Sequence, residues 1–482
     1  MRVVCAVTFV IFWLVCLHSL QAASAPDLLD GYLASGDLRA AGELLDRLAA
    51  DPKVPLEVAR AIGAACVRRG QPGLAARYLV RVAARNPQPL LLADLASAQF
   101  LAGEFAGSAA TLDAMARNGR LAPALVSLRG LAALQLGRRA EAVRHFRNAL
   151  AADPEEGTAN FHLGTLAADA GELRDAIRHF EVAARTYRDR YAARYNLALA
   201  LYRAGRWQDG VNVLEKISPD PAAAGEVENL LAQGYDKLDR VREAVEAYQK
   251  AIRLDPKNPA YVFDLAVMAL RRRTYDLAEV VLESGVLSFP QDRNLALALG
   301  GTHQLRGQME KAQQLFQRLA SAHAKDPLIC VYLGNSYFEA GRFEDAVAAF
   351  TRGIDLDPEN SVLYYQAAVS LVKLGRETDP RVRRFLGKAL ELDPKLAQAC
   401  YQLAKIDSES NPARARELLA RALRLDPELS EAHFLLSRLC RQAGDARCAQ
   451  AALRRYEALR ARERDRLERD RVKGILFTLE KR

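Results

Sequence analysis

The stretch Tyr332–Pro358 reads YLGNSYFEAGRFEDAVAAFTRGIDLDP and contains two short amphipathic segments separated by Gly341. Gly334, Ala346 and Gly353 fall inside these segments, although glycine weakens a helix interior by about 1 kcal/mol relative to alanine. Small residues at such positions let two helices approach closely, while larger aromatic residues fill the remaining space. The stretch therefore predicts a hairpin of two closely packed helices.

This hairpin recurs along the chain at a nearly constant interval. The residues equivalent to Gly341 follow one another every 33 to 35 residues, and ten of the thirteen are glycine, which can adopt a positive φ in a turn. They are Gly36, Gly70, Gly103, Gly137, Gly171, Gly205, Asp239, Arg273, Gly307, Gly341, Gly375, Ser410 and Gly444. The three exceptions predict strained or shifted turns. The period predicts a solenoid, because one helix pair cannot bury its apolar face alone.

The residue types within each period resemble those of a known family. With Pro327 counted as position 1, the repeat has Leu-Gly at positions 7 and 8, tyrosine at 11, glycine at 15, alanine at 20, phenylalanine at 24 and proline at 32. This pattern resembles the tetratricopeptide repeat, and residues 128–154, 162–184 and 231–256 match it as well. The resemblance covers about residues 22–460. It implies an all-α protein, a right-handed α-solenoid of about thirteen antiparallel helix pairs.

The N-terminus differs from the repeats. Arg2 precedes the apolar run Val3–Leu17, and small residues follow near Ala22–Ala25. This order is typical of a secretory signal peptide, which we place at residues 1–25. The alternative is an uncleaved anchor in an inner membrane, formed by residues 3–20.

The array of repeats is expected to occupy residues 26–460, with two departures from the pattern. Pro219 and Pro221 fall where a second helix should end, so a shortened helix is expected there. Two extra residues follow Gly375, so the turn at that point should be longer. Residues 461–482 are charged with both signs and predict a helix that caps the open end of the array, or alternatively one that docks on an acidic partner.

Composition and motifs argue against several classes of function. The 68 Lys and Arg residues exceed the 59 Asp and Glu residues by nine over 482 residues, without a long basic block, so we expect no nucleic-acid partner. The sequence contains no G-x-x-x-x-G-K-[ST], H-E-x-x-H, G-x-S-x-G or C-x-x-C motif. His145 and His179, both at position 23, are expected on an outer face. We therefore expect no enzymatic activity, no small-molecule cofactor and no metal.

Five cysteines lie beyond the predicted signal peptide. Cys66, Cys330, Cys400 and Cys440 occupy core positions of the repeat, which predicts buried free thiols. Cys440 and Cys448 flank one inter-helix turn, so in an oxidising compartment they could instead form a disulfide.

The resemblance also implies where partners bind. In tetratricopeptide arrays the first helices line a concave surface, and positions 2, 5, 6, 9, 12 and 13 face it. Aromatic anchors and polar side chains at these positions predict a groove for an extended peptide or a helix. The candidates are Phe161, Tyr195, Asn196, Tyr202, Arg203, Gln233, Lys237, Phe263, Arg271, Tyr332, Asn335, Phe338, Tyr365, Lys373 and Tyr401. Alternatively, tyrosine at position 5 and asparagine at position 6 pack between neighbouring repeats.

Two functions follow from these expectations. The first is an exported, non-enzymatic scaffold that binds protein or peptide partners in the groove, in a bacterial periplasm or envelope or as a secreted protein. The second is an accessory subunit of an envelope enzyme or assembly complex, in polysaccharide or outer-membrane biogenesis. Contact with a membrane is expected only through an uncleaved N-terminal segment.

Overall fold

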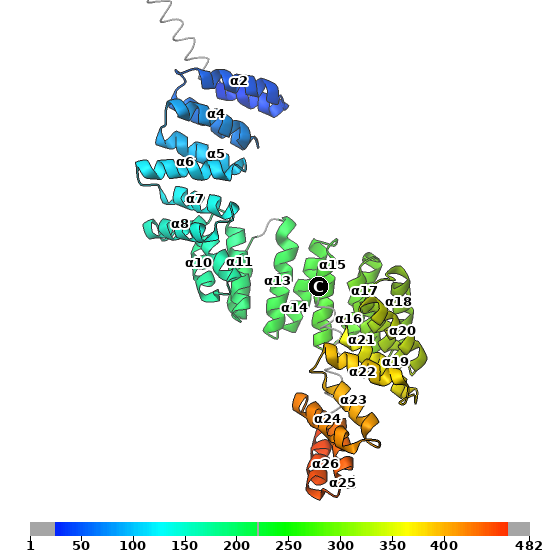
Figure 1. Ribbon diagram of the computed structural model, residues 1–482. Coiled ribbons are helices and arrows are strands. Elements are labelled where there is room, and N and C mark those ends of the chain that lie inside the picture. The colour runs from blue at the N-terminus through cyan, green and yellow to red at the C-terminus, as the bar shows by residue number, and fades with distance from the viewer. Residues whose placement is uncertain (1–24, 219–220, 461–482) are drawn as a thin grey trace, which may run out of the picture. The chain divides into compact units, whose positions relative to one another are not determined.

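The computed structural model describes residues 25–218 and 221–460, and these residues form helices joined by short turns, with no strand among them. The chain divides into two compact units, Met1–Asp220 and Pro221–Arg482. Within each unit the helices are stacked as consecutive pairs (Figure 1). Residues 1–24 of the predicted signal peptide and the predicted helix at 461–482 lie outside the described residues. No helix in the described ranges is both long and apolar enough to span a membrane.

The helices alternate between first and second members of the predicted repeats. In the first unit, residues 25–35 are helical. They are followed by α2 (Leu38–Ala50), α3 (Leu56–Arg68), α4 (Pro72–Arg85), α5 (Pro89–Leu101), α6 (Phe105–Asn118), α7 (Pro123–Gln135), α8 (Arg139–Ala152), α9 (Gly157–Asp169), α10 (Leu173–Thr186), α11 (Arg190–Arg203) and α12 (Trp207–Leu214).

The second unit starts with a 3₁₀ turn at Pro221–Ala223 and continues with seven helix pairs. These are α13 (Ala224–Lys237), α14 (Val241–Leu254), α15 (Pro259–Arg271), α16 (Tyr275–Ser288), α17 (Arg293–Leu305), α18 (Met309–Ala322), α19 (Pro327–Glu339), α20 (Phe343–Leu356), α21 (Ser361–Lys373), α22 (Pro380–Leu392), α23 (Ala397–Asp407), α24 (Pro412–Leu425), α25 (Ser430–Gln442) and α26 (Ala446–Arg460).

Close packing within a repeat depends on the small residue at position 8. A Cβ atom built on Gly334 of α19 would lie 2.5 Å from Cε1 of Phe350, the fully buried aromatic residue at position 24 on α20. The same pairing occurs in the first unit, where a Cβ on Gly164 would lie 2.8 Å from the Phe180 ring. The predicted role of the small residues is therefore confirmed.

The predicted turns also form, including the exceptional ones. All ten turn glycines have a positive φ, between 71° and 80°. Asp239 and Arg273 adopt the same conformation with φ of 61° and 58°, which is costly for residues that have a Cβ. Ser410 avoids a positive φ, and this turn instead closes with the Asn411 backbone N–H donating to the Asp407 carbonyl at 2.8 Å.

Both predicted departures from the repeat are present. Helix α12 has only eight residues, and the boundary between the two units follows it at Asp220. Helix α21 ends at Lys373 and α22 begins at Pro380, so six residues connect them, whereas three connect α19 to α20. The Asp379 side chain accepts the Arg381 backbone N–H and caps α22 after this longer turn.

The cysteines follow both of the alternatives raised by the sequence. Cys440 and Cys448 form a disulfide that joins α25 to α26, whereas Cys66, Cys330 and Cys400 are buried free thiols. Burial raises the pKa of the Cys66 thiol to about 11. Such a thiol is a poor nucleophile at neutral pH, because the thiolate is the reactive form.

Candidate functional site: the first-helix face

The candidate site is the surface formed by positions 2, 5, 6, 9, 12 and 13 of the first helices, which we call the first-helix face. Successive first helices contact one another directly, as α3 with α5, α7 with α9, α15 with α17 and α23 with α25. Among the described second helices, only α2 and α4 make comparable direct contacts. Each unit therefore bends toward its first helices, and this face lies on the inner side of the bend, as the resemblance implied.

In the first unit, the predicted aromatic residues are already packed against other rings. Phe161 on α9 is half-buried and stacks on Tyr187, with ring centroids 4.4 Å apart. Tyr195 on α11 is half-buried and stacks on Tyr191 at 5.9 Å. Part of each side chain remains accessible, so both are suited to apolar contact with a partner.

The predicted polar residues of α11 differ in availability. The side-chain amide of Asn196 donates to the Ala192 carbonyl at 2.8 Å, within its own helix. Arg203, at position 13, is exposed. Arg203 is therefore the predicted side chain of the first unit that is best placed to meet a partner.

In the second unit, the predicted residues form two groups. The half-buried members are Gln233, Asn335, Phe338, Tyr365 and Tyr401, and the exposed members are Lys237, Arg271 and Lys373. Burial raises the pKa of the Tyr365 phenol to about 12. The Arg271 guanidinium lies 3.3 Å from the Asp236 carboxylate of the preceding first helix, so it links two repeats as well as facing solvent.

Three predicted anchors are not on the surface. Tyr202, Phe263 and Tyr332 are 6%, 5% and 4% exposed. Tyr202 packs on Trp207 at 5.0 Å and Tyr332 on Phe316 at 5.4 Å, each from a neighbouring second helix. For these three side chains the expectation of an exposed position on the face is wrong, because each is buried inside the array.

A series of polar contacts between repeats was missed by the sequence analysis. Arg60 at position 5 donates to Asp94 at position 6 of the next repeat at 2.6 Å, and Asn229 donates to Asp264 in the same way at 2.9 Å. The separations of 34 and 35 residues match the period. Opposite or complementary polar residues one period apart could therefore have indicated these contacts.

Apolar exposure on the first-helix face was also missed. Leu90 and Leu101 lie at positions 2 and 13 of α5 and are 54% and 57% exposed. The half-buried aromatic rings of α9 and α11 lie at positions of the same face.

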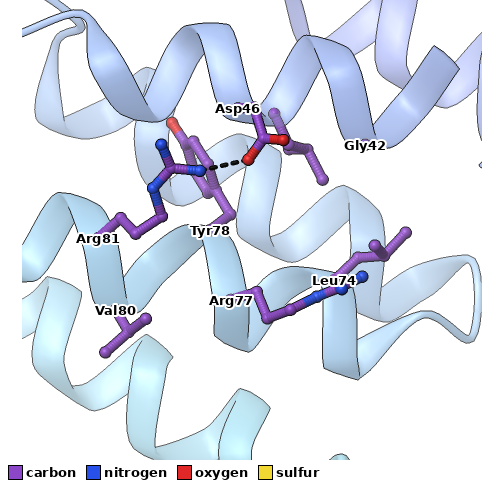
Figure 2. A pocket seen from close by; sticks show the side chains of 8 residues that line it. Gly42, Asp46, Leu74, Arg77, Tyr78, Val80 and Arg81 are labelled. Atoms are coloured by element: carbon purple, nitrogen blue, oxygen red, sulfur yellow. Dashed lines mark hydrogen bonds and ion pairs between the residues drawn. The ribbon is translucent and has the colours of Figure 1, made fainter. Parts of the chain in front are cut away.

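A separate cavity of about 320 Å³ lies on the second helices α2 and α4. Figure 2 shows Asp46 of α2 paired with Arg81 of α4, and Arg77 and Leu74 line the same cavity. Tyr78 also lines this cavity, and its buried hydroxyl has no hydrogen-bond partner in the structure. Since the Asp46–Arg81 pair joins two consecutive repeats, these residues serve the packing of the array.

The structure contradicts the outer placement of one histidine. His145 is 3% exposed, and His179 is half-buried with Nδ1 2.9 Å from Oδ1 of Asn160. Asn160 belongs to the first helix of the same repeat, so position 23 faces inward rather than toward solvent. Neither residue lies in a cluster with metal-binding geometry among the described residues.

One group of side chains in the described ranges brings possible metal ligands within 4.8 Å of one another: Glu279, Glu283 and His303. The buried Glu279 carboxylate already accepts from Arg306 Nε at 2.9 Å and lies 3.5 Å from Lys311 Nζ. Because two cations neutralise this carboxylate, the group is better suited to joining α16, α17 and α18 than to holding a metal ion.

Comparison with known protein families and sequences agrees with the repeat architecture. Three family models, each described as tetratricopeptide repeat, match residues 127–185 and 229–284, residues 167–234, and residues 327–360. Among curated proteins, the BBSome complex member BBS4 of Bos taurus is 24% identical over 162 residues, and a small glutamine-rich tetratricopeptide repeat-containing protein 2 of Mycosarcoma maydis is 25% identical over 158 residues.

These similarities extend over parts of each protein. The matches cover 34% and 32% of this chain, and 31% and 35% of the two relatives. A TPR repeat-containing protein of Treponema pallidum is 27% identical over 30% of this chain and 19% of its own length. Among solved structures, MamA is 17% identical with a TM-score of 0.31 and covers 35% of this chain and 97% of its own.

Proposed function

Because this chain belongs to the tetratricopeptide repeat family, we propose that it is a non-enzymatic scaffold that binds protein or peptide partners on its first-helix face. The observation that supports this most is the first unit, where exposed Leu90 and Leu101 and the half-buried rings of Phe161 and Tyr195 lie at positions of one face with Arg203. Apolar anchors rimmed by a charged side chain are typical of peptide-binding surfaces. A preformed face also lowers the ordering cost of binding.

We further propose that the protein is exported to a bacterial periplasm or envelope. The disulfide between Cys440 and Cys448 supports an oxidising compartment, since disulfides persist there and are rare in the cytosol. The Arg2 charge and the apolar run Val3–Leu17 support an export signal at the N-terminus.

Site-specific photocrosslinking tests the binding face. A photoreactive amino acid is introduced at Arg203 on α11, and a matched one at Arg174, which is exposed on the second helix α10. After irradiation in cells, the Arg203 position should give a discrete adduct with a partner that mass spectrometry identifies, and Arg174 should not. Equal adducts at both positions, or adducts at Arg174 alone, would reject the first-helix face as the binding site.

A further inference from the structure

The two most exposed large apolar side chains of the described residues lie on one helix of the second unit. They are Leu287 and Val280 of α16, which are 84% and 65% exposed. Seven residues separate them, and since two turns of a helix take about 7.2 residues, both side chains project from the same side of the helix. Scattered apolar side chains are ordinary on a protein surface, but two in line on one helix form a small apolar patch.

This patch is particular to α16. Val280 and Leu287 occupy positions 22 and 29 of their repeat, and the other full-length second helices of the described chain have alanine or a polar residue at both positions. The second helices on either side have exposed polar residues there: Glu246 and Arg253 in α14, and Gln314 and Ser321 in α18. Neither the repeat pattern nor packing within the chain therefore requires the two apolar side chains.

The exposed stripe of α16 is complementary to itself. Glu283 and Ser284 are exposed and lie midway between Val280 and Leu287. A second copy of this helix, laid antiparallel across that midpoint, places Leu287 of each copy against Val280 of the other. It also places Glu283 of each copy beside Ser284 of the other, whose hydroxyl can donate to the carboxylate. Such self-complementarity is what a twofold interface between identical chains requires.

The charges of the preceding second helix fit the same arrangement. A twofold axis that runs along the stack brings α14 of one copy opposite α14 of the other. Glu246 and Arg253 are exposed at the same two positions of α14, so the antiparallel arrangement directs each glutamate toward the arginine of the other copy. Glu246 also lies 3.2 Å from Arg242 in its own helix, but this pair is exposed and open to a further cation.

We propose that two copies of this chain form a dimer in which α16 packs antiparallel against α16 of the other copy. A second copy is the occupant that the surface favours, because both members of the apolar match and both members of the charge match are present on one chain. Helix α16 is a second helix, so it lies on the outer side of the bend. The dimer therefore leaves both first-helix faces open, and the proposal does not rest on the proposed function.

The dimer should be weak and reversible. The second helices of this unit do not contact one another as the first helices do, so the outer side is convex and the contact is centred on α16. Interfaces below about 1,200 Å² are typical of transient complexes. We therefore expect a dissociation constant in the micromolar range, which sedimentation velocity can measure.

Sedimentation velocity over a concentration series tests the dimer. Leu287→Asp should raise the dissociation constant at least tenfold, because in a twofold interface one substitution removes two contacts. Leu38→Asp changes an exposed leucine at the start of α2 in the first unit and should leave the dissociation constant unchanged. Wild-type protein that stays monomeric at about 100 μM, where a micromolar dimer is largely formed, would overturn the proposal. Equal effects of the two substitutions would overturn it as well.

A charge exchange tests the antiparallel arrangement. Arg253→Glu brings two glutamates toward each other at two symmetric places, so it should raise the dissociation constant at least threefold. Combining it with Glu246→Arg restores opposite charges and should recover most of this loss. If the single and the double variant dissociate alike, the antiparallel arrangement is wrong.

Cysteine crosslinking reports the contact directly. Ser284→Cys lies next to the twofold axis, so mild oxidation should join two copies by a disulfide. Ala348→Cys, at the exposed position 22 of α20, is the matched control and should remain unlinked. The native cysteines of the described chain are buried or already disulfide-bonded, so they do not compete. Crosslinking of both variants to the same extent would show random collision instead of a dimer through α16.

Discussion

Gly334 and Gly387 are both glycines within helices, but their surroundings differ. A Cβ on Gly334 would lie 2.5 Å from Cε1 of Phe350, whereas a Cβ on Gly387 of α22 would have no neighbour within 4 Å. Gly334→Ala should therefore lower the free energy of unfolding by about 1–3 kcal/mol, because overpacking outweighs the gain in helix propensity. Gly387→Ala should raise it by up to about 1 kcal/mol. Urea denaturation of both variants checks this, and equal effects would contradict the packing role.

At the scale of the helical element, the turn after α23 has no glycine, and ion pairs of the buried Asp407 side chain hold it instead. Its carboxylate lies at the end of α23, 2.6 Å from Arg383 Nη2 and 3.4 Å from Arg414 Nε. Asp407→Ala should cost about 2 kcal/mol, less than a fully buried pair, since both arginines can turn to water. Asp345→Ala, which breaks an exposed pair with Arg342, should cost less than about 1 kcal/mol. Thermal unfolding compares them, and similar losses would show that Asp407 does not hold this turn.

The last hairpin, α25 with α26, is held by the Cys440–Cys448 disulfide. Because α26 has no following described helix to pack against, Cys448→Ser should destabilise this hairpin by about 2–3 kcal/mol, the chain-entropy value for such a short loop. Hydrogen exchange should increase in α26 and remain unchanged in α3. Intact mass provides the direct check, since the denatured wild-type protein should accept two more alkylations after reduction than before it. Equal alkylation with and without reductant would contradict the disulfide.

At the scale of the whole molecule, periodicity made most of the fold predictable. Turn glycines such as Gly341 are local signals, because a positive φ is set by the residue itself and its immediate neighbours. The short α12 and the long turn after Gly375 follow from Pro219, Pro221 and two inserted residues in the same local way. The turns and helix lengths, which residues within one repeat determine, were therefore predicted well.

The candidate site was less predictable, because exposure depends on neighbouring helices. Position numbers give the direction of a side chain on its own helix, and Tyr202 and Tyr332 do lie at face positions. Whether such a side chain is accessible depends on the size of the residues beside it, here Trp207 and Phe316. His145 illustrates the same limit, since it is buried although position 23 was expected on an outer face.

Three histidines of the first unit are buried or half-buried. Burial lowers the pKa of His145, His162 and His179 below the usual value of 6.5. At pH values below about 6.5, the unfolded chain therefore binds protons that the folded unit does not. The stability that these neutral rings give is complete above the unfolded pKa and is lost as the pH falls through the folded values. The first unit should thus become progressively less stable between about pH 7 and pH 5.

The fluorescence of Trp207 in α12 reports the unfolding of the first unit, because Trp207 lies in that unit. Urea unfolding followed by its fluorescence should show a midpoint that falls as the buffer is acidified. His162→Phe keeps an aromatic ring beside Phe146, on which the imidazole stacks with centroids 5.6 Å apart, and removes one titrating group. The midpoint of this variant should therefore decrease less with acidification than that of the wild type. An unchanged pH dependence would exclude His162 as a source of the acid sensitivity, whereas a smaller pH dependence would assign part of that sensitivity to the half-buried His162 ring.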